Sequence, residues 1–317
     1  MTPAHILITG GAGFIGTHLA ERLCSEHQIT LLDNFRRDSL AQAPHLKEHP
    51  NIRVITADIR DPEAIQQAMQ GVDTVLHLAA IAGVSSYYAE SLATLQVNIL
   101  GTANVLEAAS QASVRMVVYF SSSETFGAQA LWVDESASHG IGPVADPRWV
   151  YATSKLAGEH FTMRYAETYG FDCAIVRPFN IYGPRQVGEG AISNFCRAAA
   201  RGEPLTVYGD GSAIRAWCYI SDMVDAVLAI LHTPAASGHA FNIGNPHEVE
   251  TTLGLARRVT RLVPGLTIQQ QPVTRAEVRA RIPVIDKARQ LLNYEPKIDL
   301  DEGLRQTLAW FEQEGNA

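Results

Sequence analysis

Short apolar runs alternate along the first half of the chain with segments that repeat apolar residues at helical spacing. The runs have the length and composition of buried strands. They span residues 5–9, 28–32, 52–57, 72–80, 114–120 and 171–177. The longest helical patterns cover residues 91–112 and 150–169. Because parallel strands covered on both faces are apolar throughout, this alternation predicts an α/β fold built on a doubly wound parallel sheet.

The pattern changes after residue 177, where glycine and proline interrupt the chain repeatedly. We therefore expect a first domain followed by a smaller C-terminal lobe, with one later segment packing back on the first domain. These parts are residues 1–177 for the first domain, 216–243 for the returning segment, and 178–215 with 244–317 for the lobe. Further helices are expected near residues 223–232, 251–262, 286–292 and 300–314.

A glycine-rich segment joins the first strand to the first helix. Gly10, Gly13 and Gly16 form the pattern G-x-x-G-x-x-G. Residues without side chains allow a tight turn and the close approach of a pyrophosphate, whose charge then lies at the helix N-terminus. The second strand ends in Asp33, about twenty residues further on, where a carboxylate suits the ribose 2′-hydroxyl of NAD and repels the 2′-phosphate of NADP. The arrangement predicts a Rossmann-type site for NAD.

The ends of the neighbouring strands supply the rest of the predicted cofactor site. Ala79 and Ala80 are small enough for a flat cofactor to lie close, and Asp58 could cap the adenine. Arg36 and Arg37, which follow Asp33, keep NADP open as an alternative. The predicted cofactor contacts are Gly10, Gly13, Phe14, Ile15, Gly16, Asp33, Asn34, Asp58, Ile59, Leu78, Ala79, Ala80, Asn98, Tyr151 and Lys155.

Candidate catalytic groups follow the fifth strand. Tyr151 and Lys155 are four residues apart, so a helix places them on one face, one turn apart. Ser122 and Glu124 come just after the apolar run 114–120, at the carboxyl end of a strand, where open α/β sheets hold their ligands. A tyrosine can act as a base near neutral pH only if its pKa falls by ~3 units, or ~4 kcal/mol. A cation ~4 Å away supplies this only in a partly dry site, so Lys155, the cofactor's charge and closure of the lobe are all required.

Composition narrows the class of protein. The chain has 317 residues and a net charge of −8, and no basic cluster interleaves with aromatic residues, so no nucleic-acid partner is expected. Cys24, Cys173, Cys196 and Cys218 are scattered, as is typical of free thiols in a reducing cytoplasm. No His-Glu-x-x-His pattern suggests a metal. The chain enters a strand within a few residues and has no apolar run of ~18 residues, so we expect neither a signal peptide nor a membrane span.

Taken together, the glycine loop, Asp33 and the Tyr151/Lys155 pair resemble the extended short-chain dehydrogenase/reductase family, which contains NAD-dependent nucleotide-sugar epimerases and dehydratases. The resemblance covers nearly the whole chain. It implies that Tyr151 takes the proton of a sugar hydroxyl, that Lys155 lowers the tyrosine pKa and binds the nicotinamide ribose, and that Ser122 bonds the sugar O4. It also implies a nucleotide-sugar-binding lobe and a homodimer formed through the helices at 90–112 and 150–169.

Within the family, Ser121-Ser122-Ser123-Glu124-Thr125-Phe126-Gly127 is similar to the Ser-Thr-Ser-Glu-Val-Tyr-Gly segment of UDP-glucuronate decarboxylases. Pro147-Arg148-Trp149-Val150-Tyr151 and Arg281-Ile282-Pro283 also look like that branch. The resemblance implies that Arg281 orients a reacting carboxylate, while Glu124 positions it or assists protonation at C5. The implied substrate contacts are Tyr87, Ser123, Asn180, Arg185, Arg215 and Arg281.

Decarboxylation of UDP-glucuronate is therefore the favoured reaction. A nucleotide-sugar 4-epimerase and a 4,6-dehydratase stay open, because Ser122 replaces threonine, Phe126 replaces tyrosine, and the Ser-Glu pair also occurs in dehydratases. A protein of another class, a non-catalytic NAD-binding regulator, is a further alternative.

Plainer interpretations exist for single residues. Glu124 could be a solvated loop acid, Tyr87 could serve packing, and Arg281 could pair with Asp286 or Glu277 on the surface. Arg275 and Arg279 could contact phosphate or be surface charges.

Overall fold

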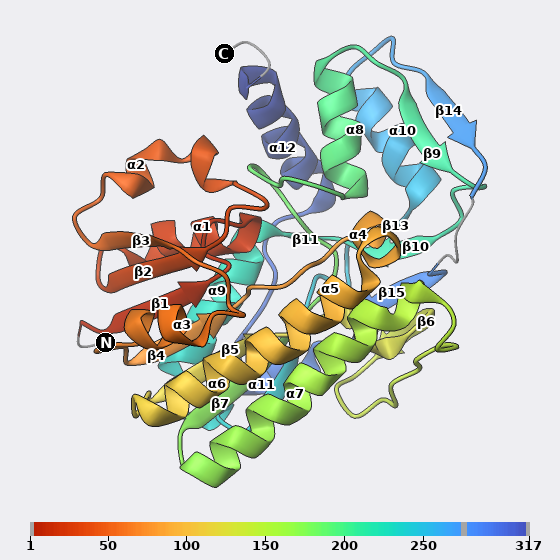
Figure 1. Cartoon of the computed structure of the whole chain (residues 1–317). Coiled ribbons are helices and arrows are strands. Elements are labelled where there is room, and N and C mark those ends of the chain that lie inside the picture. Colours follow the sequence, from red (N-terminus) through yellow and green to blue (C-terminus); the bar gives the residue numbers. More distant parts are fainter. Residues whose placement is uncertain (1–2, 274–277, 315–317) are drawn as a thin grey trace.

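The computed structural model describes residues 3–273 and 278–314. Its centre is a sheet of seven parallel strands in the order β12-β7-β5-β4-β1-β2-β3 (Figure 1). The strands are β1 His5–Thr9, β2 Gln28–Asp33, β3 Ile52–Thr56, β4 Thr74–His77, β5 Met116–Phe120, β7 Asp172–Pro178 and β12 His239–Ile243. The chain runs outward from β1 to β3 and then crosses to β4 on the other side of β1. The predicted doubly wound sheet is confirmed, and its order reverses between β1 and β4, where such sheets hold ligands.

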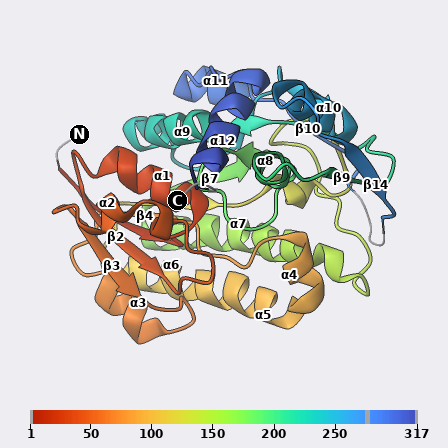
Figure 2. The ribbon, with the colours of Figure 1, turned by 90° about the horizontal axis from the view of Figure 1, so that it is seen from above.

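Helices cover both faces of this sheet (Figures 1 and 2). One layer contains α3 Pro62–Ala68, α5 Ser91–Leu95, α6 Thr102–Gln111 and α7 Val150–Tyr169, and the other contains α1 Phe14–Leu23, α9 Ile220–His232 and α11 Asp286–Leu292. Successive strand residues point to opposite faces, so Ile6 and Ile8 enter the core shared with α1 and α9, whereas Leu7 enters the core shared with α6. The helix predicted at 91–112 is present, with a π-helical segment, η2 Gln96–Gly101, between α5 and α6.

A smaller lobe carries a second sheet, in the order β13-β10-β15-β6, and a parallel pair, β14 and β9. Its elements are β6 Gln129–Val133, β9 Leu205–Tyr208, β10 Ile214–Ala216, β13 Val249–Thr251, β14 Ile268–Gln271, β15 Ala280–Pro283, α8 Ala191–Ala200, α10 Thr252–Leu262 and α12 Leu300–Glu314. In the second sheet, β15 lies parallel to β6 with Arg281 opposite Ala130. This pairing joins the C-terminal part of the chain to the segment that follows β5.

The sequence did not predict these short strands, and it did not predict β12, which pairs with β7 at the edge of the large sheet. Each is only three to five residues long and pairs with a distant segment, so local periodicity carries little signal. The remaining elements are α2 Pro44–Lys47, α4 Val84–Ala89, β8 Ile181–Tyr182, β11 Cys218–Tyr219, η1 Leu40–Gln42, η3 Ser123–Phe126, η4 Pro147–Trp149 and η5 Pro234–Ala236. Over the described part of the chain, no helix combines the length and apolar character needed to cross a lipid bilayer.

Candidate active site

A cleft of about 460 Å³ follows the carboxyl ends of the central strands and reaches the smaller lobe. It brings together all five predicted catalytic residues: Ser122, Glu124, Tyr151, Lys155 and Arg281. Every predicted cofactor contact except Asn98 also lines it, and so do Tyr87, Ser123 and Asn180 from the predicted substrate contacts. Residues from widely separated segments thus meet at one place.

The glycine turn is shaped for close approach. Gly10 has a φ of +71°, and a Cβ on it would lie 2.7 Å from the backbone nitrogen of Ala79. A Cβ on Gly16 would lie 2.6 Å from the carbonyl oxygen of Gly10. Helix α1 begins at this turn with no side-chain cap and no acidic residue in its first turn, so its N-terminal N–H groups face no competing anion of its own. These features fit the pyrophosphate of a dinucleotide.

Asp33 braces the same turn. Its carboxylate accepts hydrogen bonds from the backbone N–H groups of Ala12 (3.0 Å) and Phe35 (2.8 Å). Burial raises the pKa of Asp33, and the two N–H groups oppose that rise. Nearby, Arg36 forms two hydrogen bonds with Glu90 (2.6 and 2.7 Å), and Arg37 donates to the carbonyl of Ala82 (2.7 Å). Both arginines therefore already have partners in the protein.

Asn98 and Arg185 were predicted to contact ligands, but the structure places both outside the cleft lining. The Asn98 side chain accepts from the backbone N–H of Ile81 (2.8 Å) and donates to Ser154 (3.0 Å), so it fastens the loop after β4 to α7. The Arg185 guanidinium pairs with Glu21 and bonds His18 (2.9 Å), which fastens the loop after β8 to α1. Both residues support segments of the cleft wall.

Tyr151 and Lys155 lie on the buried face of α7, as their spacing predicts. The Lys155 ammonium donates to the carbonyl of Phe120 (2.7 Å) and lies 5.9 Å from the centre of the Tyr151 ring. Burial lowers the pKa of Lys155 to about 7. Burial and then the charge of Glu124 raise the pKa of Tyr151, and a hydrogen bond from the Ser122 hydroxyl only partly offsets this.

The expected lowering of the tyrosine pKa requires the charge of the bound cofactor as well as Lys155, so it stays a prediction; in the protein alone the pKa of Tyr151 is raised. The reason is physical: the Lys155 ammonium bonds a carbonyl, and the penalty of burying a phenolate outweighs the charges of Arg37 and Arg281 nearby.

Tyr87 stacks on Tyr151, with ring centres 4.9 Å apart and planes 10° apart. Its hydroxyl accepts a hydrogen bond from the backbone N–H of Gly83 (3.1 Å). Tyr87 thus both lines the cleft and fixes the plane of the Tyr151 ring. The plainer prediction of packing is therefore met by the stack on Tyr151, and the predicted substrate contact of Tyr87 stays a prediction.

Two arginines clamp Glu124. Arg281 pairs with one of its carboxylate oxygens and Arg148 with the other, both at 2.5 Å. Burial alone would raise the pKa of Glu124, but the charges of Arg281 and Arg148 outweigh burial and hold that pKa below its usual value. Arg281 is only 3% exposed, so the alternative of a surface pair with Asp286 is wrong. The other partner considered, Glu277, lies outside the described residues.

Sequence reasoning missed the role of Arg148, although a signal was present. This residue precedes Tyr151 by three positions, and η4 and α7 are continuous there, so its side chain returns to the tyrosine face. Its guanidinium lies 5.7 Å from the centre of the Tyr87 ring.

The clamp retains unused hydrogen-bonding capacity. Within the described residues, Nη1 of Arg148 and Nε of Arg281 are buried and have no hydrogen-bond partner. One carboxylate between two guanidinium groups also leaves one positive charge uncompensated at this point. Buried donors without partners are rare in folded proteins and cost free energy, so this corner of the cleft is suited to a second anion.

A second hollow of about 380 Å³ continues from the clamp toward the smaller lobe. It is lined by the predicted contacts Asn180 and Arg215 and by Trp217, whose buried indole nitrogen also lacks a partner among the described residues. Asn180 donates to the carbonyl of Ala216 (2.9 Å). Arg279 is exposed, and Arg275 lies outside the described residues. No cluster of His, Cys, Asp and Glu in the described ranges is placed to hold a metal ion.

The profile of the NAD dependent epimerase/dehydratase family matches residues 6–244. The chain belongs to this family. UDP-glucuronic acid decarboxylase 1 of Danio rerio is 35% identical over 314 residues, which are 98% of this chain and 73% of that protein. A UDP-N-acetyl-alpha-D-glucosaminuronate decarboxylase of Bacillus cytotoxicus is 34% identical, and the match covers 97% of each chain. The solved UDP-glucuronic acid 4-epimerase of Bacillus cereus, in complex with UDP-glucuronic acid and NAD, superposes with a TM-score of 0.90 at 28% identity, covering 98% of this chain and 99% of that one.

Membership of the epimerase/dehydratase family confirms the predicted resemblance and makes the chain an NAD-dependent enzyme. A non-catalytic regulator is not supported, because the similar proteins are enzymes and Tyr151, Lys155 and Ser122 all meet in the cleft. When bound, NAD would lie on the glycine turn and Asp33, and it would supply the hydride acceptor.

Proposed function

We propose that the protein decarboxylates a UDP-hexuronate, with UDP-glucuronate as the first substrate to test. The observation that carries this proposal is the clamp around Glu124. It places an uncompensated positive charge at the cleft that Tyr151 and Ser122 also line, and two of its donor atoms have no partner among the described residues. A neutral hydroxymethyl group on the sugar would leave that charge unpaired, whereas a C6 carboxylate would pair with it.

The side chains divide the reaction between them. Tyr151 takes the O4 proton while the hydride leaves C4, and Ser122 bonds the same oxygen. The resulting C4 ketone makes the C6 acid a β-keto acid. Arg281 and Arg148 hold the carboxylate, the C5–C6 bond breaks with release of carbon dioxide, and its electron pair forms an enolate at C4 and C5. Tyr151 and Ser122 donate to the enolate oxygen, and C5 then takes a proton from solvent, with the Glu124 carboxylate positioning the water that delivers it.

The raised pKa of Tyr151 means that the first step of the reaction, removal of the O4 proton, needs help from a nearby positive charge. Because burial disfavours the phenolate in the protein alone, deprotonation needs additional positive charge close to the phenol. The oxidised nicotinamide carries such a charge. We therefore expect the enzyme to take the O4 proton only when cofactor and substrate are both bound.

The test is incubation with NAD and a panel of UDP-, dTDP- and GDP-sugars, followed by mass spectrometry of the products. Loss of carbon dioxide from UDP-glucuronate or its 2-acetamido counterpart supports the proposal. Loss of water indicates a dehydratase, and unchanged mass with altered stereochemistry indicates a 4-epimerase. The assay also shows whether the reduced cofactor returns its hydride to the product.

A 4-epimerase acting on an acid sugar is the second candidate. It is favoured by the close superposition on the UDP-glucuronic acid 4-epimerase of Bacillus cereus, and the positive corner would suit its substrate equally well. A Glu124→Gln variant separates the two reactions. Epimerisation needs only hydride return to the other face of the ketone and should largely survive, whereas protonation at C5 should not.

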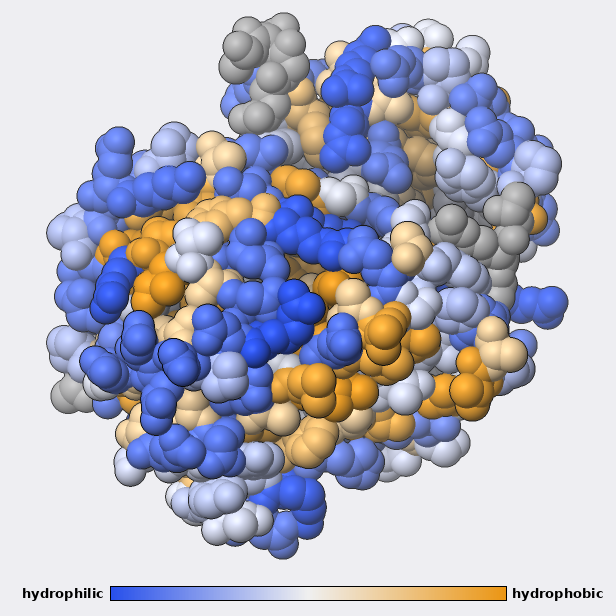
Figure 3. All heavy atoms as spheres, in the orientation of Figure 1, coloured by the Kyte–Doolittle hydropathy of each residue, from blue (hydrophilic) through white to orange (hydrophobic). Residues whose placement is uncertain are grey.

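We further propose a cytoplasmic homodimer in which residues 178–215 and 244–317 hold the nucleotide sugar. Apolar side chains gather on the face formed by α5, α7 and β6 (Figure 3). Leu92 of α5 and Leu100 of η2, the segment that follows α5, are 67% and 56% exposed. A second copy would cover them. Four buried thiols that form no disulfide are in keeping with a reducing compartment. Size-exclusion chromatography with light scattering tests the dimer, and Leu92→Glu with Leu100→Glu should dissociate it.

A further inference from the structure

A buried ion pair lies next to Lys155 and has no part in the reaction as described so far. Glu159 follows Lys155 by one helical turn on α7, and Arg177 lies near the end of β7. Their side chains meet in two hydrogen bonds, at 2.9 and 2.6 Å, and both residues are at most 5% exposed. Neither lines the cleft. Isolated buried pairs add little to stability, so a role for this pair must be sought in what it touches.

Glu159 touches the turn that carries the catalytic hydroxyl. Its carboxylate accepts a hydrogen bond of 2.5 Å from the Ser121 hydroxyl, while Lys155 donates to the carbonyl of Phe120. Two residues one turn apart on α7 therefore bind two successive residues at the end of β5. The next residue is Ser122, which caps η3 by accepting from the backbone N–H of Glu124 (3.1 Å). The position of the Ser121–Ser122 turn therefore depends on the two hydrogen bonds that Lys155 and Glu159 form with the end of β5.

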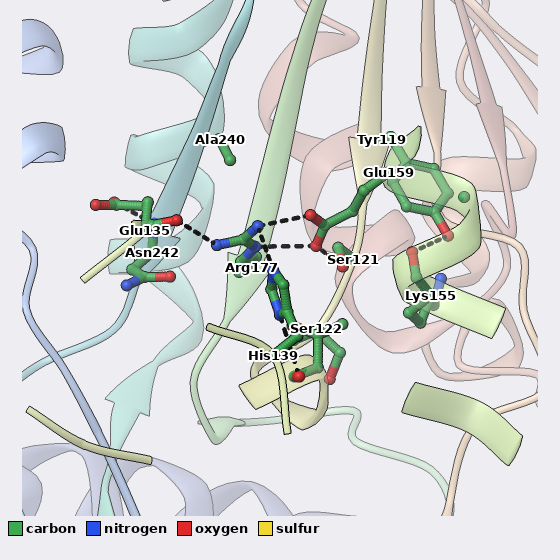
Figure 4. Close-up of polar contacts among 12 residues, drawn as sticks. Tyr119, Ser121, Ser122, Glu135, His139, Lys155, Glu159, Arg177, Ala240 and Asn242 are labelled. Carbon is green, nitrogen blue, oxygen red and sulfur yellow. Dashed lines mark hydrogen bonds and ion pairs between the residues drawn. The ribbon is translucent and has the colours of Figure 1, made fainter. Parts of the chain in front are cut away.

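The ion pair of Glu159 and Arg177 also has a fixed orientation relative to the Lys155 ammonium. Figure 4 shows Arg177 between the Glu159 carboxylate on one side and Glu135 and His139 on the other. Arg177 bonds the carbonyl of Glu135 (3.2 Å) and Nε2 of His139 (3.3 Å). The negative end of the pair thus faces Lys155, and the positive end faces away.

No other group described below supplies a negative charge to Lys155 in place of the Glu159 carboxylate. The titratable and charged groups on the elements packed around the ammonium are Tyr151 and Glu159 of α7, Tyr119 of β5, His77 of β4, Arg177 of β7, and Glu135 and His139 of the segment after β6. Burial lowers the pKa of His77 to about 3 and raises that of Tyr119, so both are neutral at physiological pH. Burial lowers the pKa of Lys155, and Glu159 is the charge that opposes this effect.

We propose that Glu159, held in place by Arg177, is a positioning residue that favours the ammonium form of Lys155 and fixes the Ser121–Ser122 turn against α7. One carboxylate then sets both the charge and the geometry needed for proton removal at O4. The inference rests on the proposed oxidation at C4 but not on decarboxylation, since each candidate reaction begins with that step.

The test compares pH profiles of kcat for reduction of enzyme-bound NAD by an accepted nucleotide sugar. Glu159→Gln removes the charge and keeps the shape, so Lys155 loses its proton at lower pH. We expect the alkaline limb of the profile to move down by on the order of one pH unit. Glu159→Asp keeps the charge and should move the limb by less than half as much. Glu167→Gln, at an exposed position on α7, is the matched control and should leave the limb in place.

An alkaline limb that stays fixed in Glu159→Gln, or that moves equally in both Glu159 variants, would overturn the proposal. If Glu159→Gln does not fold, Ser121→Ala tests the attachment, because it leaves the ion pair intact. It should lower kcat about tenfold without moving the limb, and wild-type kcat in Ser121→Ala would also overturn the proposal. Wild-type enzyme that reduces NAD with no nucleotide sugar would instead contradict the proposed function.

Discussion

The cofactor half and the substrate half of the cleft are built in different ways. The cofactor half consists of backbone, glycine and small residues from β1, β2 and β4, and its charged side chains Asp33, Arg36 and Arg37 are paired inside the protein. The substrate half consists of long charged side chains from η3, η4 and β15, and it retains buried donors without partners within the described chain. In the cofactor half, the close approach of backbone atoms selects the ligand by shape. In the substrate half, the charged side chains select the ligand, and members of one family can differ in these side chains and therefore in the reaction that they catalyse.

Tyr151 lies where the cofactor half and the substrate half meet, so Tyr151→Phe should have the largest effect on activity. Without the phenol oxygen no side chain takes the O4 proton, so kcat should fall by ~10³-fold or more. NAD affinity should change less than about threefold, because the ring keeps its stack on Tyr87. Stopped-flow absorbance and calorimetric titration measure the two quantities. Tyr165→Phe on the same helix is the control, and comparable loss in that variant would refute a special role for Tyr151.

Arg281→Gln acts on the substrate half alone. Removing one cation from the clamp leaves no surplus positive charge for a C6 carboxylate, so kcat/KM for UDP-glucuronate should fall by ~10²-fold. The midpoint of thermal unfolding should fall as well, because Glu124 keeps only Arg148 as a charged partner. Arg279→Gln, two residues away and exposed, is the matched control. A parallel loss of NAD affinity in Arg281→Gln would break the division between the two halves.

Gly10→Ala acts on the cofactor half alone. The new Cβ would meet the backbone at Ala79 in a region of positive φ, so the turn must shift, and the NAD dissociation constant should rise ~10-fold or more. Gly170→Ala is the matched control, since its φ of +78° is equally unfavourable but nothing lies within 4 Å of the added carbon. Both variants should lose stability, and only Gly10→Ala should lose cofactor affinity. Equal affinities in the two variants would show that the turn does not set the NAD site.

The cofactor half could be predicted from the sequence better than the substrate half, because the residues that form it are recognised by short-range patterns. Glycine spacing, a strand-terminal Asp33 and small residues after β4 lie within eighty residues and follow from backbone geometry, and all of them line the cleft. Tyr151 and Lys155 likewise needed only helical spacing. The large sheet could be predicted for the same reason, because its strands are continuous apolar runs.

The substrate half depends on pairing across the chain. Arg281 reaches Glu124 because β15 lies beside β6, two short strands without a clear pattern of their own. Its placement was expected only from the resemblance to decarboxylases. Arg148 and Glu159 stood three residues before Tyr151 and four after Lys155, at helical spacing, yet spacing could not reveal their partners. Arg185 shows the converse error: it lies in a loop beside the substrate lobe, but its partner is Glu21 on α1.

Lys155 lies on the boundary of the two halves, and its burial makes the stability of the protein depend on pH without acting on either ligand. Burial lowers its pKa from 10.5 to about 7 on folding. Between these values the unfolded chain binds more protons than the folded one, so folding becomes more favourable as pH rises. The free energy of unfolding of wild type relative to Lys155→Met should be constant below about pH 7, rise by at most ~1.4 kcal/mol per pH unit above it, and level off near the pKa of lysine in the unfolded chain.

Urea unfolding of both proteins from pH 6 to 10 measures this difference, and a flat curve would show that the ammonium stays charged in the folded protein. In that case the charge would belong permanently to the site, and the division between a paired cofactor half and a charged substrate half would have to be redrawn to include Lys155.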